Sequence, residues 1–560
     1  MVASRAHAAT STRAGGWWRR QLRAPLAPTV GAVVLFWLSL TPSLLPLGPV
    51  FQGVVSALCA LLGYAAGALA GWMLRSSGVH LRGARRERTW RVVAAVAVTG
   101  TLVALWLGHR WDDELRDLVG VERDGVDADL LMLAVAALLF TILLAVGRAL
   151  KAAAGWVARQ IGRVLPERVA VVAGALVVAW VAWGLVTGVV GDRAVTSLDA
   201  TFKVINDEFR TELEAPTSPY VSAGPESDES WDDLGRQGRI FIAAAPTEED
   251  IAAFSGGTAT APVRAYVGAP DGIELRETAE RAVDELDRMG GFDRSVLNVV
   301  TGTGRGWVNE NQARALEFMW AGDTATVSMQ YSYLPSWMSF LVDGDRAQDA
   351  GRLLFDAVYA RWVELPRDSR PRLVVSGESL GSFGGEAAFS GAQDLATRTD
   401  GALFVGPTNN NRLWSRFTAE REAGTPEVLP VYDGGAVVRF ADVPTDWTAP
   451  GAWPGPRIGY LQHANDPITW WDWSLALSRP DWLEEEPGRD VSTHVRWIPV
   501  VTMLQLAADQ VVANDVPAGQ GHQFGQEPAR AWAEILPPPG WTDEDTERLV
   551  TTVRDRRTQE

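Results

Sequence analysis

A serine flanked by two glycines is the clearest candidate for chemistry in this chain of 560 residues. It lies in Gly377-Glu378-Ser379-Leu380-Gly381, one residue after the apolar run Leu373–Val375 and before a stretch with helical character. On a sharp turn from a strand into a helix, Gly377 and Gly381 leave room for the backbone to expose the serine as a nucleophile. A chance match in a chain with 54 glycines is the alternative, and the strand before the motif argues against it.

A serine hydroxyl reacts only when a base removes its proton, and histidine is the usual base. Three histidines follow Ser379 in the chain: His463, His494 and His522. His522 lies in the glycine-flanked loop Gly519–Gly525, after a helix-like stretch, where a base can reach over the turn that carries the serine. His494 lies in an extended segment and His463 precedes the candidate acid, so we predict His522 as the base.

The base must in turn be oriented by a carboxylate, which is expected after the serine and before the histidine. Asp466 follows the apolar run Ile458–Leu461. A carboxylate just past the carboxyl end of a parallel strand lies on the active face of the sheet, so we predict Asp466 as the acid. Asp472 and Asp515 remain as rival candidates for the acid. Either could instead be an ordinary solvated group, as a single aspartate usually is.

Two backbone N–H groups must stabilise the negative oxygen that forms during acyl transfer. We expect one from Leu380 and the other from Thr303 or Gly304 in the glycine-rich loop 301–307. A dinucleotide-binding loop is the alternative interpretation of these glycines. It fails because the spacing is Gly-x-Gly-x-Gly and because Asp323 precedes the next strand, where the ribose-binding acid should follow it. We predict no cofactor and no metal site.

Short apolar runs alternate with helical patterns between residues 236 and 560. This alternation predicts an α/β fold with a mostly parallel sheet and helices on both faces. Strands are expected at 239–243, 263–267, 295–300, 326–331, 373–376, 401–405 and 458–461, and helices at 274–289, 311–320, 346–365 and 501–512. The irregular segment 406–456 lies between two strands, where we expect a cap-like insertion.

The first third of the chain differs in composition and contains long apolar runs. Five of them are long enough to cross a bilayer, at roughly 28–47, 51–74, 90–108, 129–150 and 169–191. We therefore predict a basic tail at 1–27, an all-α transmembrane bundle of about five helices at 28–191, a linker at 192–235 and the α/β domain at 236–560.

The loops between the apolar runs differ in charge. Arginine is concentrated in the tail and in the loops after the second and fourth runs, whereas acidic residues dominate the loop between the third and fourth runs. Because basic loops remain on the cytoplasmic side, we predict a multi-pass protein of the cytoplasmic membrane with its N-terminus inside and the α/β domain outside.

Charge and cysteine content exclude several functions. Residues 1–191 hold 19 Lys and Arg against 10 Asp and Glu, whereas the rest holds 32 against 58. The acidic second part argues against nucleic acid as a partner, because phosphate binding requires a basic face. Cys59 is the only cysteine and lies in the second apolar run, so the outer domain has no disulfide and no cysteine nucleophile.

The chain resembles the bacterial integral-membrane α/β-hydrolase family over nearly its whole length. The shared features are the hydrophobic N-terminal block, Thr-Gly-Thr-Gly-Arg-Gly-Trp at 301–307, Tyr-Ser-Tyr-Leu-Pro-Ser-Trp at 331–337, Gly-Glu-Ser-Leu-Gly at 377–381 and Asn-Asp-Pro around Asp466. The resemblance implies an α/β-hydrolase fold and a serine hydrolase with Ser379, Asp466 and His522 as its triad.

A membrane-tethered esterase or lipase is therefore expected, with the lipid bilayer and a lipid or acyl-ester substrate as partners. A cluster of tryptophans near Asp466 favours an apolar acyl-binding wall, with core packing as the alternative for each of them: Trp414, Trp447, Trp453, Trp470, Trp471, Trp473 and Trp482. The competing hypotheses are a non-catalytic scaffold with a hydrolase-like domain and a transporter, which the almost uncharged spans disfavour. The sequence makes no prediction of the oligomeric state.

Overall fold

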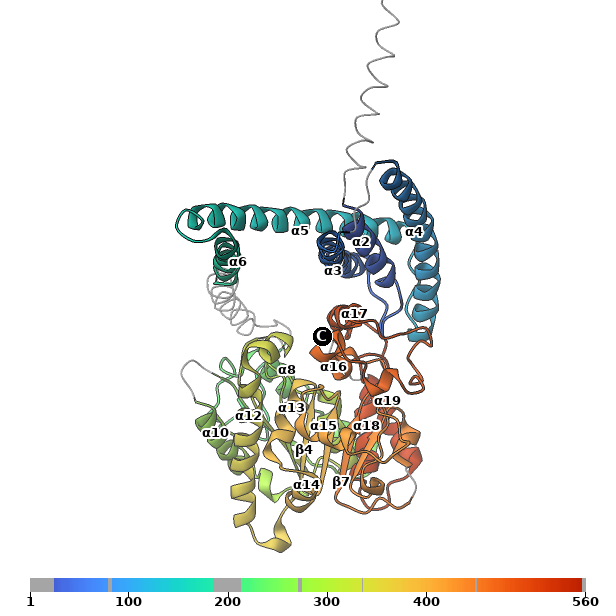
Figure 1. Cartoon of the computed structure of the whole chain (residues 1–560). Coiled ribbons are helices and arrows are strands. Elements are labelled where there is room, and N and C mark those ends of the chain that lie inside the picture. The colour runs from blue at the N-terminus through green and yellow to red at the C-terminus, as the bar shows by residue number, and fades with distance from the viewer. Residues whose placement is uncertain are drawn as a thin grey trace, which may run out of the picture. The chain divides into compact units, whose positions relative to one another are not determined.

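The computed structural model describes residues 25–78, 83–184, 213–269, 274–334, 336–448 and 451–555. The chain forms two compact units, which we name the helical unit and the α/β unit (Figure 1). The helical unit comprises Met1–Trp183, Trp471–Glu484 and Val491–Val512, and the α/β unit comprises Gly184–Trp470, Glu485–Asp490 and Ala513–Glu560.

Four of the described helices are long and apolar enough to cross a membrane. They are α3 (Pro49–Ser76), α4 (Gly83–Val119), α5 (Val126–Ile161) and α6 (Glu167–Gly184). A fifth helix, α2 (Leu26–Leu38), has 13 residues and a length of about 20 Å, which is less than the hydrocarbon core of a bilayer. The prediction of about five spans is thus corrected to four candidate spans and one shorter apolar helix.

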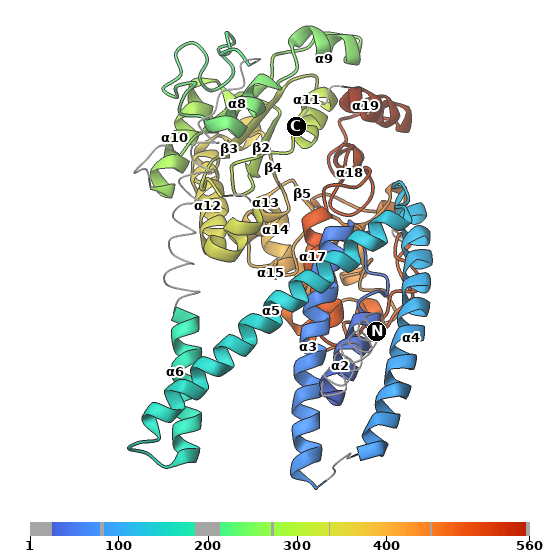
Figure 2. The same cartoon turned by 90° about the horizontal axis from the view of Figure 1, so that it is seen from above.

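The short helix α2 packs closely beside α3 (Figure 2). A Cβ atom added at Gly31 would lie 2.1 Å from the carbonyl oxygen of Gly63, so the two backbones approach where neither has a side chain. The predicted apolar run continues past Leu38, but Pro42 and Pro46 cannot extend a helix. The chain therefore reaches α3 through the irregular segment 39–48, in which Leu44 and Leu45 are buried.

The α/β unit contains a seven-stranded sheet, counted over the described residues, in the order β1-β3-β2-β4-β5-β7-β6. All neighbouring strands pair in parallel. The strands are β1 (Val263–Val267), β2 (Val296–Thr301), β3 (Thr324–Met329), β4 (Arg372–Glu378), β5 (Gly401–Val405), β6 (Val438–Ala441) and β7 (Arg457–Leu461). The predicted α/β fold class is confirmed.

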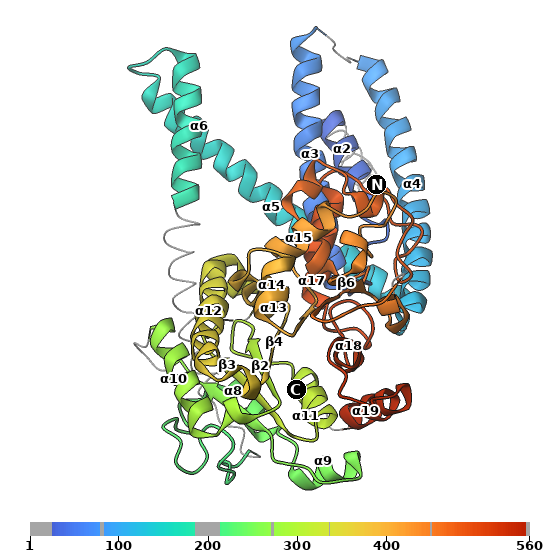
Figure 3. The ribbon, with the colours of Figure 1, turned by 90° about the horizontal axis from the view of Figure 1, so that it is seen from below.

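Helices cover both faces of this sheet (Figure 3). One face carries α11 (Glu310–Met319) and α18 (Glu527–Ile535), and the other carries α10 (Leu275–Arg288), α12 (Ser336–Glu364), α13 (Leu380–Gly385) and α14 (Ala392–Arg398). The strand residues Val374, Leu403 and Val405 pack with α11 and α18 in one apolar cluster. The remaining helices are α8 (Gly235–Ala243), α9 (Glu248–Ser255), α15 (Arg412–Ala419), α16 (Pro467–Trp470), α17 (Val501–Val512) and α19 (Asp543–Asp555).

Two segments differ from the sequence-based expectation. Residues 239–243 were expected as a strand and instead form the second half of α8, whose buried residues recur with helical spacing. The loop 301–307 therefore follows the second strand of the sheet and not the third. The segment 406–456 contributes β6, which pairs with β7 at the edge of the sheet, so part of the expected cap-like insertion belongs to the sheet itself.

Candidate active site

The nucleophile motif forms a strained turn between β4 and α13. Ser379 has φ 56° and ψ −124°, a left-handed conformation that a non-glycine residue rarely adopts. A Cβ atom at Gly377 would lie 2.3 Å from the Gly381 carbonyl oxygen, and one at Gly381 would lie 2.3 Å from that of Thr301. Both glycines are therefore required by close backbone contacts, as the sequence motif predicts.

The candidate acid and base are hydrogen-bonded to each other. Asp466 follows β7 and is fully buried, and its carboxylate accepts a hydrogen bond from the backbone N–H of Ile468 at 2.9 Å. His522 lies in the loop before α18, and its Nδ1 lies 2.6 Å from Asp466 Oδ2. This bond makes Nδ1 the protonated nitrogen and leaves Nε2 as the nitrogen that can accept a proton.

The His522 ring lies at the carboxyl end of β5, the strand next to the nucleophile turn. A Cβ atom at Gly406 would lie 2.5 Å from Cε1 of His522. The preceding residue, Val405, accepts a hydrogen bond from the backbone N–H of Ser379 at 2.9 Å. Nε2 of His522 is buried and has no hydrogen-bond partner among the described residues, so the structure joins His522 to Asp466 but does not show a hydrogen bond from Ser379 to His522. A buried nitrogen without a partner is costly, and a catalytic role is one explanation for it.

The charge state of His522 depends on opposing effects. Burial disfavours the imidazolium, but the charge of Asp466 and its hydrogen bond outweigh burial, so the pKa of His522 is raised above its ordinary value. Glu378 adds to this increase, whereas the positive charge of His463 opposes it. The arrangement can therefore take up a proton at Nε2 and stabilise the imidazolium that results.

The loop that carries His522 is held by side chains that follow β7. Nδ1 of His463 lies 2.7 Å from the carbonyl oxygen of Gly521, and Nε2 lies 2.8 Å from Oε2 of Glu527. Asn465 accepts a hydrogen bond from the backbone N–H of Gly521 at 2.8 Å. This supporting role was not predicted from the sequence, although His463 and Asn465 both belong to the segment that ends in Asp466.

Glu378 is a second group that the sequence analysis did not single out. It directly precedes Ser379 and is buried, and it accepts hydrogen bonds from the side chains of Asn309 and Gln312 at the start of α11. Burial raises the pKa of the Glu378 carboxyl, and the nearby His522 partly opposes that effect. An acidic residue inside an otherwise apolar strand-to-turn segment is the signal that could have identified it.

The two expected oxyanion donors differ in their surroundings. Leu380 is buried and is the first residue of α13, where a backbone N–H has no partner within the helix. The N–H of Thr303 instead donates to the carbonyl of Trp307 at 2.9 Å within its own loop. Of the two residues predicted in that loop, Thr303 is thus engaged in the turn, and the expected second donor is Gly304.

The other aspartates and the other histidine considered for the triad are engaged elsewhere or exposed. Asp472 accepts a hydrogen bond from the backbone N–H of Ser474 at 2.7 Å, and Asp515 is exposed. His494 belongs to the helical unit, where its Nε2 lies 3.2 Å from Oε2 of Glu114.

Most of the tryptophans near Asp466 are core residues. Five of them are buried: Trp414, Trp447, Trp453, Trp470 and Trp482. Trp473 is 68% exposed. Core packing, the alternative considered for each tryptophan, therefore accounts for most of the cluster.

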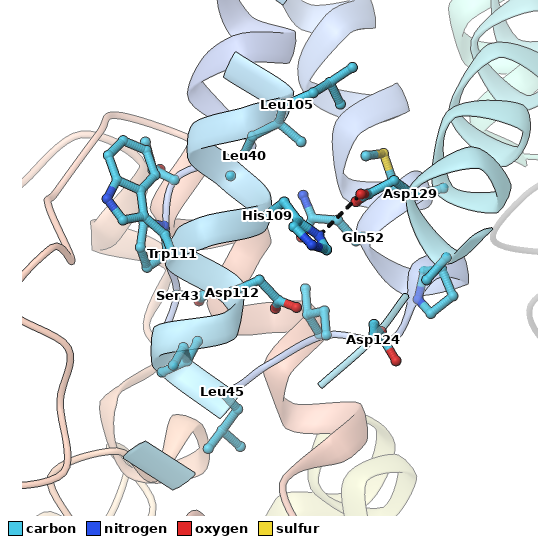
Figure 4. Close-up of a pocket in the computed structure, with 18 residues that line it drawn as sticks. Leu40, Ser43, Leu45, Gln52, Leu105, His109, Trp111, Asp112, Asp124 and Asp129 are labelled. Atoms are coloured by element: carbon cyan, nitrogen blue, oxygen red, sulfur yellow. Dashed lines mark ion pairs between the residues drawn. The ribbon is translucent and has the colours of Figure 1, made fainter. Parts of the chain in front are cut away.

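A separate cavity of about 80 Å³ lies within the helical unit (Figure 4). Nδ1 of His109 lies 3.1 Å from Asp129 Oδ2 across this cavity. Arg116 binds the two other lining carboxylates, Asp112 and Asp124, each at 2.6 Å. The charged groups that line the cavity are thus paired with neighbouring groups of the same unit.

Two protein-family models match the chain. A model described as "Alpha/beta-hydrolase family" matches residues 263–549, and one described as "Alpha/beta-hydrolase family N-terminus" matches residues 40–246. No curated protein and no solved structure matches the chain. The first match covers more than half of the chain and includes the nucleophile turn, the aspartate after β7 and the histidine loop.

Proposed function

Because the chain belongs to the alpha/beta-hydrolase family, we propose that it is a membrane-tethered serine hydrolase that cleaves ester bonds. The proposed catalytic groups are Ser379 as nucleophile, His522 as base and acid, and Asp466 as the group that orients His522. The observation that carries this proposal is the state of the His522 ring, whose Nδ1 is bound to Asp466 while the buried Nε2 has no hydrogen-bond partner among the described residues.

The proposed reaction has two steps. Ser379 Oγ attacks the carbonyl carbon of the ester, and Nε2 of His522 takes up the hydroxyl proton. The bond to the alcohol then breaks, and His522 returns the proton to the leaving alcohol. Water attacks the acyl-enzyme with His522 again as base, which releases a carboxylic acid and restores Ser379.

Stabilisation of the oxyanion is assigned to two backbone N–H groups. Leu380 supplies the first from the start of α13, and Gly304 supplies the second from the loop after β2. Support for this pairing comes from the contact between the loop and the turn, since Gly381 packs on the carbonyl oxygen of Thr301. Preorganised donors of this kind typically contribute about 3 kcal/mol each to the lowering of the barrier.

A lipid or acyl ester is the proposed substrate class. The apolar helices α3–α6 support a location at a membrane, where such substrates are concentrated. The insertion between Asp466 and His522 also exposes apolar groups, with Trp473 at 68% and Leu477 at 84% exposure. Indole and leucine side chains that face solvent in a membrane-tethered protein suit contact with the interfacial region of a bilayer.

The α/β unit is proposed to lie outside the cytoplasmic membrane. The connection between α4 and α5 is acidic, whereas the connections from α3 to α4 and from α5 to α6 are basic. With four crossings by α3 to α6, the start of α3 and the end of α6 lie on the same side as the acidic connection. The correction from five spans to four therefore leaves the proposed side of the α/β unit unchanged, but it moves the start of α3 to the outer side and so no longer supports the cytoplasmic N-terminus predicted with five spans.

Hydrolysis of a series of p-nitrophenyl esters by the purified full-length protein tests this function. We expect hydrolysis by the wild type and a loss of at least about a thousandfold in Ser379→Ala, because the residual rate then rests on binding and the oxyanion donors alone. Ser369→Ala, which removes an exposed hydroxyl before β4, is the matched control and should retain the full rate. A wild type that hydrolyses no ester, or equal rates in Ser379→Ala, would contradict the proposal.

A further inference from the structure

Arg305 lies in the glycine-rich loop 301–307, directly after Gly304, the proposed second oxyanion donor. A tight turn surrounds it, because the backbone N–H of Gly306 donates to the carbonyl of Thr303 at 2.7 Å. The backbone of Arg305 is therefore held in place beside the proposed oxyanion site. Its guanidinium group takes no part in the proposed reaction.

Arg305 is half-buried and lacks a counter-charge. Among the described residues, its guanidinium forms no hydrogen bond and no ion pair, and the charge that acts on it is the like charge of Arg236. Burial and, to a smaller extent, Arg236 lower the pKa of Arg305. The buried Arg264 of the same unit instead pairs with Glu317 through two nitrogens, at 2.7 and 2.8 Å. A partly desolvated cation beside a like charge is expected to take an anion from outside the chain.

Contacts of Tyr266 bring Arg236 to this loop. Arg236 is the second residue of α8, and Gly238 lies two residues further along the same helix. A Cβ atom at Gly238 would overlap the Tyr266 ring, so α8 packs directly on that ring. The Tyr266 hydroxyl in turn donates to the carbonyl of Gly306 at 2.9 Å. The start of α8 and the loop 301–307 are therefore held together within the α/β unit.

Two neighbouring guanidinium groups suit a phosphate group as ligand. Each guanidinium presents N–H donors in a planar fork that matches two oxygens of one phosphate. A phosphate has enough oxygens to bind both forks, and its negative charge reduces the repulsion between them. Residues 192–560 carry an excess of acidic residues, so the pair Arg236 and Arg305 is a local exception in a part of the chain that otherwise repels anions.

We propose that Arg305, with the charge of Arg236 beside it, binds the phosphate group of an ester substrate next to the proposed oxyanion site. The substrate class is then a phosphate-bearing lipid ester, in which one molecule carries both the phosphate and the ester that is cleaved. This inference rests on the proposed function and narrows its substrate class. Arg305 determines specificity and does not act on the ester bond, so its loss should affect phosphate-bearing esters and spare neutral ones.

Two esters that differ only in the phosphate test this inference: dihexanoyl glycerophosphate and dihexanoylglycerol, with the full-length protein in detergent. In Arg305→Ala, we expect kcat/KM for the phosphate ester to fall at least about tenfold, mainly through KM, because charge-assisted hydrogen bonds are lost. For dihexanoylglycerol, kcat/KM should change less than about twofold. Arg305→Lys keeps the charge without the planar fork and should lose less than Arg305→Ala. Arg276→Ala, which removes an exposed guanidinium from α10, is the matched control and should behave like the wild type.

Inorganic phosphate distinguishes a free anion from a lipid headgroup. We expect it to compete with the phosphate ester and to raise the thermal midpoint of the wild type, and to do neither in Arg305→Ala. A raised midpoint together with equal effects of Arg305→Ala on both esters would show a site for free phosphate only and would overturn the substrate assignment.

Three further outcomes separate this inference from the proposed function. Wild-type kcat/KM of Arg305→Ala for both esters would overturn the inference, as would a wild type that cleaves p-nitrophenyl esters but not the phosphate ester. A wild type that cleaves none of these esters would overturn the proposed function. In that case, a thermal midpoint that inorganic phosphate raises in the wild type but not in Arg305→Ala would still support an anion site at Arg305.

Discussion

Two buried histidines, His463 and His522, contact the same loop before α18, and their hydrogen bonds give them different roles. His522 has one nitrogen on Asp466 and leaves the other without a partner among the described residues. His463 has an acceptor at both nitrogens, the Gly521 carbonyl and the Glu527 carboxylate. A ring with two acceptors holds both protons and has no lone pair for catalysis, so His463 supports the loop while His522 remains available as a base.

The pH dependence of stability should report the role of His463. Burial alone would lower its pKa, but the Glu527 carboxylate, the Gly521 carbonyl and Asp442 outweigh burial and raise the pKa of His463 to about 9. The pKa of His463 in the folded protein therefore lies above its value of about 6.5 in the unfolded chain. Because of this difference, the charged His463 stabilises the folded protein fully below pH 6.5, and this stabilisation is lost as the pH rises to 9. Its full size is on the order of 3 kcal/mol.

His463→Gln cannot carry this charge and should therefore remove that part of the pH dependence. We expect the thermal midpoint of the wild type to fall between pH 6.5 and 9 more steeply than that of the variant, and the two curves to converge near pH 9. Thermal midpoints of both proteins in the same detergent across this range supply the measurement. Parallel curves would show that His463 is not charged in the folded protein.

At the scale of elements, the ends of three neighbouring strands bring the candidate site together. The nucleophile turn follows β4, Gly406 follows β5 and Asp466 follows β7. Gly406 has φ 51° and lies against the His522 ring, so the end of β5 sets how closely the ring can approach. The absence of a side chain at this position is therefore a requirement of the site and not only of the turn.

Gly406→Ala should separate these two requirements. The added Cβ would lie 2.5 Å from Cε1 of His522 and 2.8 Å from Cε2 of Phe524, so we expect the ring to move and kcat to fall on the order of 100-fold. Gly424→Ala is the matched control, because Gly424 also has a positive φ but has open space around it. Both variants bear the backbone strain of about 1 kcal/mol, and equal kcat losses in both would contradict the role assigned to Gly406.

The elements that the sequence predicted well are those in which local pattern and burial agree. The runs at 263–267 and 401–405 form β1 and β5 with these bounds, since every residue in them is buried between two helical layers. β6 was missed because it has four residues with Arg439 among them, and the guanidinium is buried over the Trp453 ring, 4.8 Å from its centre. The partners of this buried arginine include the Trp453 ring and the carbonyls of Trp447 and Gly451 in the loop after β6, and the pattern of the strand itself does not show them.

The part of the candidate site that follows local sequence patterns could be predicted, and the part that depends on contacts between distant residues could not. Ser379 and its glycines follow from the geometry of a tight turn, and Asp466 follows from its place after a strand. The contacts of His463 and Asn465 with the loop around Gly521 join residues more than 50 positions apart. Such contacts depend on how the loop folds back over the sheet, so they required the three-dimensional structure.

At the scale of the whole molecule, the chain joins an α/β-hydrolase unit, with its proposed ester-cleavage site, to helices that are long and apolar enough to cross a membrane. The charge of the connections between α3 and α6 predicts the side on which each helix end lies. α5 alone has 36 residues, or about 54 Å, so its two ends lie on opposite sides of a bilayer if it spans.

Single cysteines at the two ends of α5 test this orientation in a Cys59→Ser background. We expect a membrane-impermeant maleimide to label Asp127→Cys in intact cells and Arg163→Cys only after permeabilisation, because Asp127 lies in the first turn of α5, next to the acidic connection, and Arg163 lies in the basic connection after α5. Labelling of both variants after permeabilisation is the control, because it shows that both introduced cysteines can react. The reverse pattern would place the α/β unit on the cytoplasmic side.

Activation of Ser379 as a nucleophile by His522 can be measured with a fluorophosphonate probe, which reacts with activated serines. The full-length protein is treated with the probe, and the modified residue is identified by mass spectrometry. We expect a single adduct on Ser379 that forms in the wild type and at least about 100-fold more slowly in His522→Ala. No adduct on Ser379 in a folded wild type, or an equal rate in His522→Ala, would contradict this activation.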